Sequence, residues 1–236
     1  MIDGLLLVDK PEGISSFGVV AKVRWLITQD VKRTHQERGY CKNPEQKTTH
    51  CRCKVKVGHT GTLDPAATGL LVLAIGAYTK KVPALIKQDK IYEVEMTVGK
   101  ASTTGDKEGD ISQVSATQPT QEQIETAMTR FTGELMQTPP TFSAIKVNGQ
   151  RAYDLARKGK EVHMEPRPVV IYSNALTAYS YPTVRFVSHV GSGTYIRSLV
   201  EDIGTMLGTG AYMSNLRRIK ISSYSNGLLS GSFTLT

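Results

Sequence analysis

The sequence predicts a mixed α/β (α+β) protein, because strand patterns and helix patterns occur along one chain. Residues 90–98, KIYEVEMTV, alternate apolar with polar side chains, as a strand with one buried face does. Residues 70–75, LLVLAI, are an unbroken apolar run of the length of a buried strand. Between residues 16 and 27, apolar side chains recur at intervals of three and four, the spacing of a helix that buries one face.

The N-terminal third of the chain predicts a strand, a turn and a helix. Residues 4–8 are a short apolar run that ends at a Lys-Pro turn. Ser15 or Ser16 can cap the following helix, because a serine hydroxyl accepts a bond from the free N–H groups of a first turn. After the apolar run of residues 70–75, a further helix is expected over residues 77–87, where Pro83 either bends the helix or delays its start.

The C-terminal half continues with alternating helix and strand signals after a polar loop at residues 99–110. Thr120 and Gln123 have the spacing of a capping box, so a helix is expected to begin there. Asn148 and Gly149 form a strong hairpin-turn signal. The remaining expected elements are a short basic helix at 151–158 closed by Gly159, strands at 169–172, 175–179 and 183–190, and a helix whose apolar face runs from Ile196 to Leu207 and which Gly208 closes.

Composition and charge restrict the class of protein. The 236 residues carry a formal net charge of +8, which favours a polyanionic partner. The longest apolar run, residues 70–75, is far shorter than the roughly 20 residues that span a bilayer. No signal peptide is recognised at the N-terminus. We therefore expect a cytoplasmic protein that associates with RNA and not with membranes. We also expect it to be a monomer.

Residues 30–56 form a strongly basic stretch. Eight Lys and Arg against three Asp and Glu give it a net charge of +5, and it shows no hydrophobic periodicity, so we expect a long loop that faces RNA. Cys41, Cys51 and Cys53, with His35 and His50, raise the alternative of a zinc site. Their spacing differs from the common zinc patterns, which keep two to four residues between paired ligands.

The loop of residues 57–71, VGHTGTLDPAATGLL, is the most informative stretch. It is rich in Gly, Thr and Pro and runs directly into the apolar strand of residues 70–75. Pro65 biases Asp64 away from the helical region. One carboxylate is thus expected on a stiff turn attached to a core strand, as a catalytic group requires. The alternative is an ordinary Asp-Pro turn in which Asp64 bonds nearby N–H groups.

This loop closely resembles the signature loop of the TruB-type tRNA pseudouridine synthases. The resemblance extends over nearly all of residues 4–222, with the motifs in the family's order. They are VDKPEGISSFGVV, GHTGTLDPAATGLL with KIY, PPTFSAIKVNGQRAYDLARKG, GSGTYIRSLVEDIG and NLRR. The chain departs from the family at residues 102–104, where Ser-Thr-Thr stands in place of Thr-Asp-Thr.

The resemblance implies a pseudouridine synthase fold, with a long, mostly antiparallel central sheet, flanking helices and a catalytic cleft. It implies a single catalytic domain, which we place at 1–225 with the basic insertion at about 30–56 and a tail at 226–236. Members of the family usually carry a small C-terminal RNA-binding domain, but only about eighteen residues follow Arg218, so we expect no C-terminal PUA-like domain. The resemblance also implies that the Lys-Pro turn packs beside the loop of residues 57–71. The implied activity is the isomerisation of uridine to pseudouridine in the T loop of tRNA, at position 55, without cofactor or metal. The alternative is a non-catalytic RNA-binding or RNA-folding protein on the same scaffold.

The resemblance also assigns roles to single residues. Asp64 is the expected catalytic acid, Arg197 its ion-pair partner, and Tyr92 the ring that stacks on the target base. Arg197 is notable in itself, because a cation near a helix N-terminus opposes the helix dipole and needs a carboxylate or a functional reason. The expected substrate-binding residues are His59, Gly61, Thr62, Ile145, Lys146, Arg157 and Leu216. Plain structural roles remain open for several of them: a core aromatic for Tyr92, a turn histidine for His59, and surface charges for Lys146 and Arg157.

Overall fold

The computed structural model describes residues 2–38, 54–143, 145–147, 149–222 and 224–225. These residues form two compact units, the first within Met1–Ile86 and the second within Lys87–Ser225. Both units combine strands with helices, so the predicted mixed α/β class is confirmed.

The first unit is built on strand β3, which pairs with two other strands of this unit. Its elements are β1 (Gly4–Lys10), α1 (Ser16–Glu37), β2 (Val57–His59), β3 (Thr68–Ile75), the 3₁₀-helix η1 (Gly76–Lys81) and α2 (Val82–Leu85). Strand β1 pairs antiparallel with β3 along its whole length, and β2 pairs antiparallel with the end of β3. The buried side of α1 packs against these strands through a shared apolar cluster of Val8, Val19, Val20, Val23, Leu71 and Leu73.

Helix α1 begins where the sequence predicted and continues further than expected. Ser15 is the N-cap, and its hydroxyl accepts a bond from the N–H of Gly18 at 3.0 Å. The helix continues to Glu37, so the prediction of a loop from residue 30 onwards is wrong for its first part. Residues 30–37 contain a single apolar side chain, that of Val31, so this helical extension has no apolar period to detect. The cysteines of the candidate zinc site lie outside the described residues.

Two smaller differences concern the loop after α1 and the second helix. Residues 57–59, expected as part of a loop, form the short strand β2. The helix expected over residues 77–87 is a 3₁₀ turn followed by α2, in which Pro83 occupies the first turn. The delayed start was one of the two predicted effects of this proline, which fits only where no N–H bond is needed.

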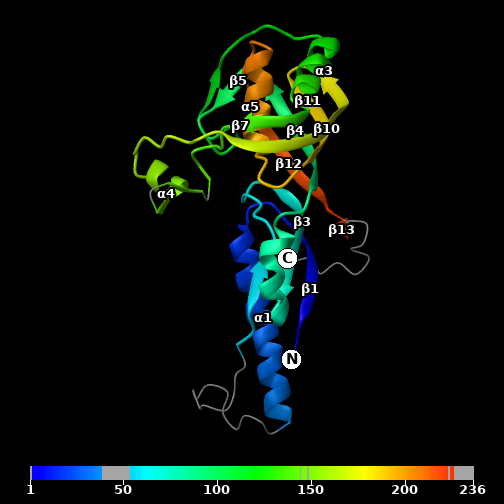
Figure 1. Ribbon diagram of the computed structural model, residues 1–236, viewed down its shortest axis with the longest axis vertical. Coiled ribbons are helices and arrows are strands. Elements are labelled where there is room, and N and C mark those ends of the chain that lie inside the picture. The colour runs from blue at the N-terminus through cyan, green and yellow to red at the C-terminus, as the bar shows by residue number, and fades with distance from the viewer. Residues whose placement is uncertain (1, 39–53, 144, 148, 223, 226–236) are drawn as a thin grey trace. The chain divides into compact units, whose positions relative to one another are not determined.

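The second unit contains an antiparallel sheet with two helices on it (Figure 1). The strands follow one another in the order β12 (Ala211–Ile221), β4 (Lys90–Val98), β11 (Thr183–Val190), β10 (Arg167–Ser180) and β7 (Gly133–Gln137), with β13 (Tyr224–Ser225) beside β12. Helix α3 (Gln121–Arg130) packs on β10, helix α5 (Ile196–Met206) packs on β12 and β4, and the two helices contact each other.

The sequence signals correctly predict the start of α3 and the end of α5 before Gly208, but the short helix expected at 151–158 covers only Ala152–Ala156. Thr120 and Gln123 form the capping box of α3, with each side chain bonded to the other's backbone N–H. The apolar faces of α3 and α5 are buried. Two short hairpins complete the unit: β5 (Lys100–Ser102) with β6 (Ile111–Gln113), and β8 (Lys146–Val147) with β9 (Gln150–Arg151), which leads into α4 (Ala152–Ala156).

The strands differ from the predictions in several places. Strand β5 lies within residues 99–110, which were expected to be a polar loop, and strands β6 and β7 were not predicted. The two strands expected at 169–172 and 175–179 are parts of one strand, β10, whose pairing with β11 contains two register irregularities. Strand β12 was not predicted. Its pairing with β4 is interrupted twice, and Arg218 is buried within it, so its sequence does not alternate cleanly between apolar and polar.

Candidate active site

Asp64 lies in the loop that joins β2 to β3 in the first unit. The N–H of Thr60 donates to the C=O of Val72, within β3, at 3.0 Å. The N–H of Ala67 donates to the C=O of Asp64 at 3.1 Å and closes a tight turn through Pro65. The carboxylate therefore sits on a turn that is tied to a buried strand, as the sequence predicted.

The residues on either side of this carboxylate are held by the N-terminal segment. The hydroxyl of Ser16 donates to the C=O of Leu63 at 2.9 Å and accepts from its N–H at 2.8 Å. The C=O of Pro65 accepts bonds from the ammonium of Lys10 at 3.1 Å and from the N–H of Gly13 at 2.9 Å. The expectation that the Lys-Pro turn packs beside this loop is confirmed.

Three residues of the predicted substrate site lie at the start of this segment, His59 at the end of β2 and Gly61 and Thr62 in the loop that follows. His59 is the last residue of β2, and its Nδ1 accepts a bond from the N–H of Gly61 at 3.4 Å. This contact supports the structural interpretation of His59 as a turn histidine. The roles of His59, Gly61 and Thr62 toward an RNA base stay predictions.

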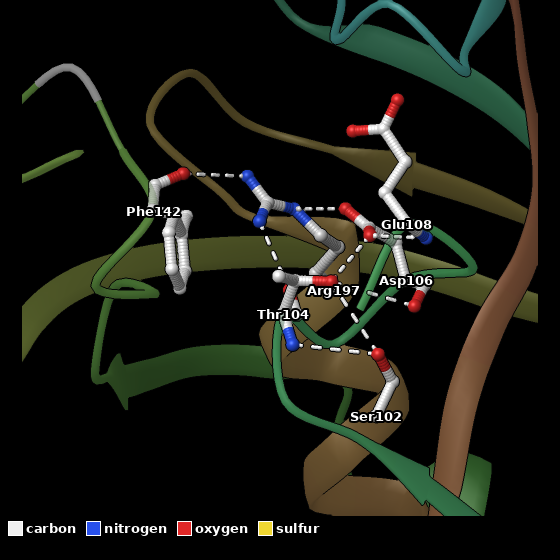
Figure 2. A network of polar contacts seen from close by, with 6 residues as sticks. All are labelled: Ser102, Thr104, Asp106, Glu108, Phe142 and Arg197. Atoms are coloured by element: carbon white, nitrogen blue, oxygen red, sulfur yellow. Dashed lines mark hydrogen bonds and ion pairs between the residues drawn. The ribbon is translucent and has the colours of Figure 1, made fainter. Parts of the chain in front are cut away.

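Arg197 is the second residue of α5, and it is 6% exposed. Figure 2 shows its guanidinium held from three directions. Nη1 donates to the C=O of Thr104 at 3.0 Å, Nη2 donates to the C=O of Phe142 at 2.9 Å, and Nε lies 3.6 Å from Oδ2 of Asp106. A cation at a helix N-terminus was expected to need a carboxylate partner, and Asp106 supplies one.

Asp106 is a candidate functional residue that sequence reasoning missed. It is 4% exposed, and its Oδ1 accepts bonds from the hydroxyl of Thr104 at 2.6 Å and from the N–H of Glu108 at 3.0 Å (Figure 2). These bonds fix one carboxylate oxygen and direct the other toward Arg197. The sequence did indicate that Arg197 needs a carboxylate partner. It did not indicate which one, because nothing in the local sequence distinguishes Asp106 from the other acidic residues of its loop.

A second carboxylate lies close to this ion pair. Burial raises the pKa of Glu201, one helical turn beyond Arg197 in α5, and the charges of Asp202 and Asp106 add to the rise, while Arg197 opposes it. Gly105 leaves room for this side chain, since a Cβ added there would lie 2.7 Å from Oε1 of Glu201. The guanidinium of Arg197 thus has two acidic neighbours in the second unit.

The start of α5 is fastened to the segment that follows β7. Gln137 donates through Nε2 to the C=O of Tyr195 at 3.1 Å and accepts from the N–H of Tyr195 at 2.8 Å. Ser198 donates to the C=O of Thr138 at 2.8 Å. Together with the bond from Arg197 to Phe142, these contacts fix the backbone on which the guanidinium depends.

Tyr92 and Leu216 lie on neighbouring strands of the second unit. Tyr92, in β4, is 7% exposed and faces Arg218 of β12 in the strand register. Leu216 is 8% exposed and stands opposite Val94. Burial to this extent fits a core aromatic for Tyr92, and its stacking on a base stays a prediction, as does the lining role of Leu216.

The remaining predicted residues lie near the β8–β9 hairpin and α4. Lys146 and Arg157 are exposed, whereas Ile145 is half-buried and its C=O accepts a bond from the N–H of Ala152 at 2.7 Å. The guanidinium of Arg157 lies 5.7 Å from the ring centre of Tyr153. Exposed cations beside an aromatic ring are compatible with phosphate contacts and equally with plain surface charge.

The predicted site residues therefore fall into two groups. The first unit carries Asp64 and its loop, and the second carries Arg197, Tyr92 and the remaining predicted residues, together with Asp106, which was not predicted. The ion pair between Asp64 and Arg197 stays a prediction. Among the residues that the structure describes, no group of three or more His, Cys, Asp or Glu is arranged to hold a metal ion. No helix in the described ranges is both long and apolar enough to cross a membrane.

The sequence matches two protein-family models. The N-terminal domain of the TruB family pseudouridylate synthases matches residues 47–196, and the tRNA pseudouridylate synthase B C-terminal domain matches residues 197–232. The tRNA pseudouridine synthase B of Pseudomonas fluorescens is 40% identical over 224 residues, and that of Clostridium acetobutylicum is 40% identical over 225 residues. These similarities define the class, that of the pseudouridylate synthases. Within it, the chain belongs to the TruB family.

The matched regions cover most of this chain and a smaller part of its relatives. The alignments include 95% of this chain in both cases, but 65% of the Pseudomonas protein and 69% of the Clostridium protein. Among solved structures, a Cbf5–Nop10–Gar1 complex is similar over 94% of this chain and 50% of the matched chain, with a TM-score of 0.65 and 27% identity. An H/ACA RNP bound to a substrate RNA is similar with a TM-score of 0.61 and 25% identity, over 94% of this chain and 49% of the matched chain.

Proposed function

We propose that this protein isomerises uridine to pseudouridine in tRNA, at position 55 of the T loop. The observation that carries the proposal is the GHTGTLDP loop, in which Asp64 sits on a turn between β2 and β3 with both neighbours held in place. Membership of the TruB family supports the reaction. The name of the curated relatives, tRNA pseudouridine synthase B, supports tRNA as the substrate.

The reaction explains which residue types are needed. The bond between N1 of uracil and C1′ of the ribose breaks, the base turns, and C5 forms the new bond to C1′. The proton on C5 is lost and N1 gains one, so atoms and electrons balance without a redox partner. The protein must therefore supply an ionised carboxylate near the sugar, a binding pocket for the turned base, and a means of excluding water.

In this proposal Asp64 is the ionised carboxylate, acting either at C1′ or on a proton of the sugar. Taking a carboxylate out of water favours its neutral form unless a cation is near, and we assign that cation to Arg197. The assignment is supported by the burial of Arg197 and by its three fixed partners, which hold the guanidinium without help from substrate. Asp106 then orients Arg197 and does not itself react.

Binding must also remove the uridine from its loop. Turning a nucleotide out of a folded RNA costs a few kcal/mol. Stacking on an aromatic ring is worth about 1–3 kcal/mol per base, and we assign this role to Tyr92. His59 would fill the space that the base leaves. Lys146 and Arg157, both exposed, would contact phosphates, and the net charge of +8 would attract the RNA. We propose a monomeric, cytoplasmic enzyme.

Tritium release tests the proposed reaction directly. The protein is incubated with a tRNA transcript that carries tritium at C5 of its uridines, and the released tritium is counted. The proposal predicts release from uridine 55 and none when position 55 is cytidine. Tight binding without any release would instead favour the non-catalytic RNA-binding protein, and release that does not depend on position 55 would exclude the assigned target.

A further inference from the structure

The start of helix α1 contacts the candidate catalytic loop through one side chain. Ser16, the first residue of α1, is 1% exposed, and Leu63 is 3% exposed. A hydroxyl carries one donor and two acceptor positions. Ser16 uses both functions on the same residue, donating to the C=O of Leu63 at 2.9 Å and accepting from its N–H at 2.8 Å.

These two bonds act on the backbone that leads into Asp64. The C=O of Leu63 and the N–H of Asp64 belong to one planar peptide unit, so holding the first fixes the orientation of the second. The bond to the N–H of Leu63 fixes the preceding peptide plane in the same way. Beyond Asp64, the C=O of Pro65 is held by Lys10 and by the backbone of Gly13. The backbone is therefore held on both sides of Asp64.

We propose that Ser16 is a positioning residue for the carboxylate of Asp64. It acts through Leu63 and does not touch the substrate. The proposal rests on the proposed function, in which Asp64 must meet the ribose at a fixed distance. A shift of about 1 Å in a catalytic group can lower a rate by about a hundredfold, so a small backbone change at Leu63 is sufficient to affect turnover.

The role of Ser16 is separate from the capping of α1. The helix cap is the neighbouring Ser15, whose hydroxyl accepts from the N–H of Gly18 at 3.0 Å. The two adjacent serines thus divide two tasks: Ser15 stabilises the helix end, and Ser16 orients the loop. Ser15→Ala is therefore a matched control, since it makes the same substitution one residue away and leaves both bonds to Leu63 intact.

The test compares turnover with binding in the full chain. For Ser16→Ala we expect kcat for tritium release from tRNA to fall about tenfold or more, with Kd for tRNA within about twofold of wild type. For Ser15→Ala we expect a lower Tm but a kcat within about twofold of wild type. Ser16→Cys places a slightly larger thiol, a weak donor and acceptor, at the same position, so its kcat should lie between those of wild type and Ser16→Ala.

Hydrogen exchange provides a readout that does not depend on activity. The N–H of Leu63 should exchange faster in Ser16→Ala than in wild type, and Ser15→Ala should leave it unchanged. A wild-type kcat in folded Ser16→Ala would overturn the positioning role of Ser16. If the alanine variant does not fold, a wild-type kcat in Ser16→Cys would do the same. In either case, turnover by the wild-type protein would still support the proposed function. If the wild-type protein releases no tritium, the proposed function fails and the positioning role falls with it.

Discussion

Replacement of Asp106 by Asn tests whether the buried ion pair orients Arg197. Asn keeps the size of the side chain and an oxygen at Oδ1, so the bonds from the Thr104 hydroxyl and the Glu108 N–H can remain. It removes the negative charge at Oδ2, which lies 3.6 Å from Nε of Arg197. The substitution therefore isolates the charge from the rest of the network.

The magnitude follows from this distance and from burial. Two unit charges 3.6 Å apart attract by about 4–5 kcal/mol at an effective dielectric constant of about 20. Both side chains are buried, at 7% and 6% exposure, so solvent screens the pair little. Removing one partner of a buried pair costs about 3–5 kcal/mol, and two carbonyl bonds to Arg197 remain. We expect the free energy of unfolding to fall by about 2–4 kcal/mol.

Urea unfolding and tritium release measure the two effects of Asp106→Asn. We expect kcat to fall at least about tenfold, because the guanidinium loses its charged partner on the Nε side, while tRNA affinity changes little. Glu108→Gln is the matched control: it removes a charge from the same loop, but that side chain is exposed and only its N–H contacts Asp106. Equal stability and equal kcat in Asp106→Asn and Glu108→Gln would refute the reasoning.

Three further predictions concern pH, packing and RNA binding. Burial lowers the pKa of Lys90 from 10.5 to about 8, so between these pH values the unfolded chain binds more protons than the folded protein does. The free energy of unfolding of the wild type should therefore rise with pH relative to that of Lys90→Met. Urea unfolding from pH 7 to 10.5 measures this, and a difference between the two proteins that stays constant with pH would contradict it. Gly105→Ala should lower the free energy of unfolding by about 1–3 kcal/mol, more than Gly149→Ala does. Both glycines have positive φ, but only at Gly105 would a Cβ contact Glu201. Equal losses in the two variants would show that the contact with Glu201 contributes nothing. Deleting residues 39–53 removes three basic residues and one acidic residue, and it should weaken tRNA binding and flatten its dependence on salt; an unchanged slope would show that this segment contacts no phosphates.

Elements with local signals were predictable from the sequence. The capping box of Thr120 and Gln123 located the start of α3, and clean alternation located β4. Strand β12 lacked such a signal, because its register is broken twice and a buried arginine, Arg218, occupies a position where alternation predicts an apolar residue. Pairing with neighbouring strands, not local pattern, determines this strand.

In the candidate site, too, residues with a local sequence signal were predictable and residues that depend on distant contacts were not. Asp64 was predictable because its loop carries a long and specific motif. Arg197 was noticeable because its charge opposes the helix dipole at its position. Asp106 was missed because its partner lies far along the chain, and the fold alone brings the two together. The bonds of Ser16 to Leu63 were hidden for the same reason, since the sequence shows two adjacent serines and both could cap the helix.

The most direct test of the account is tritium release by Asp64→Asn under single-turnover conditions. The substitution keeps the size of the side chain and removes its charge. We expect no release above background and a Kd for tRNA close to that of the wild type. Asp110→Asn, at an exposed position in the second unit, should release tritium as fast as the wild type does. Release by Asp64→Asn at the wild-type rate would contradict the central claim that this carboxylate converts uridine to pseudouridine.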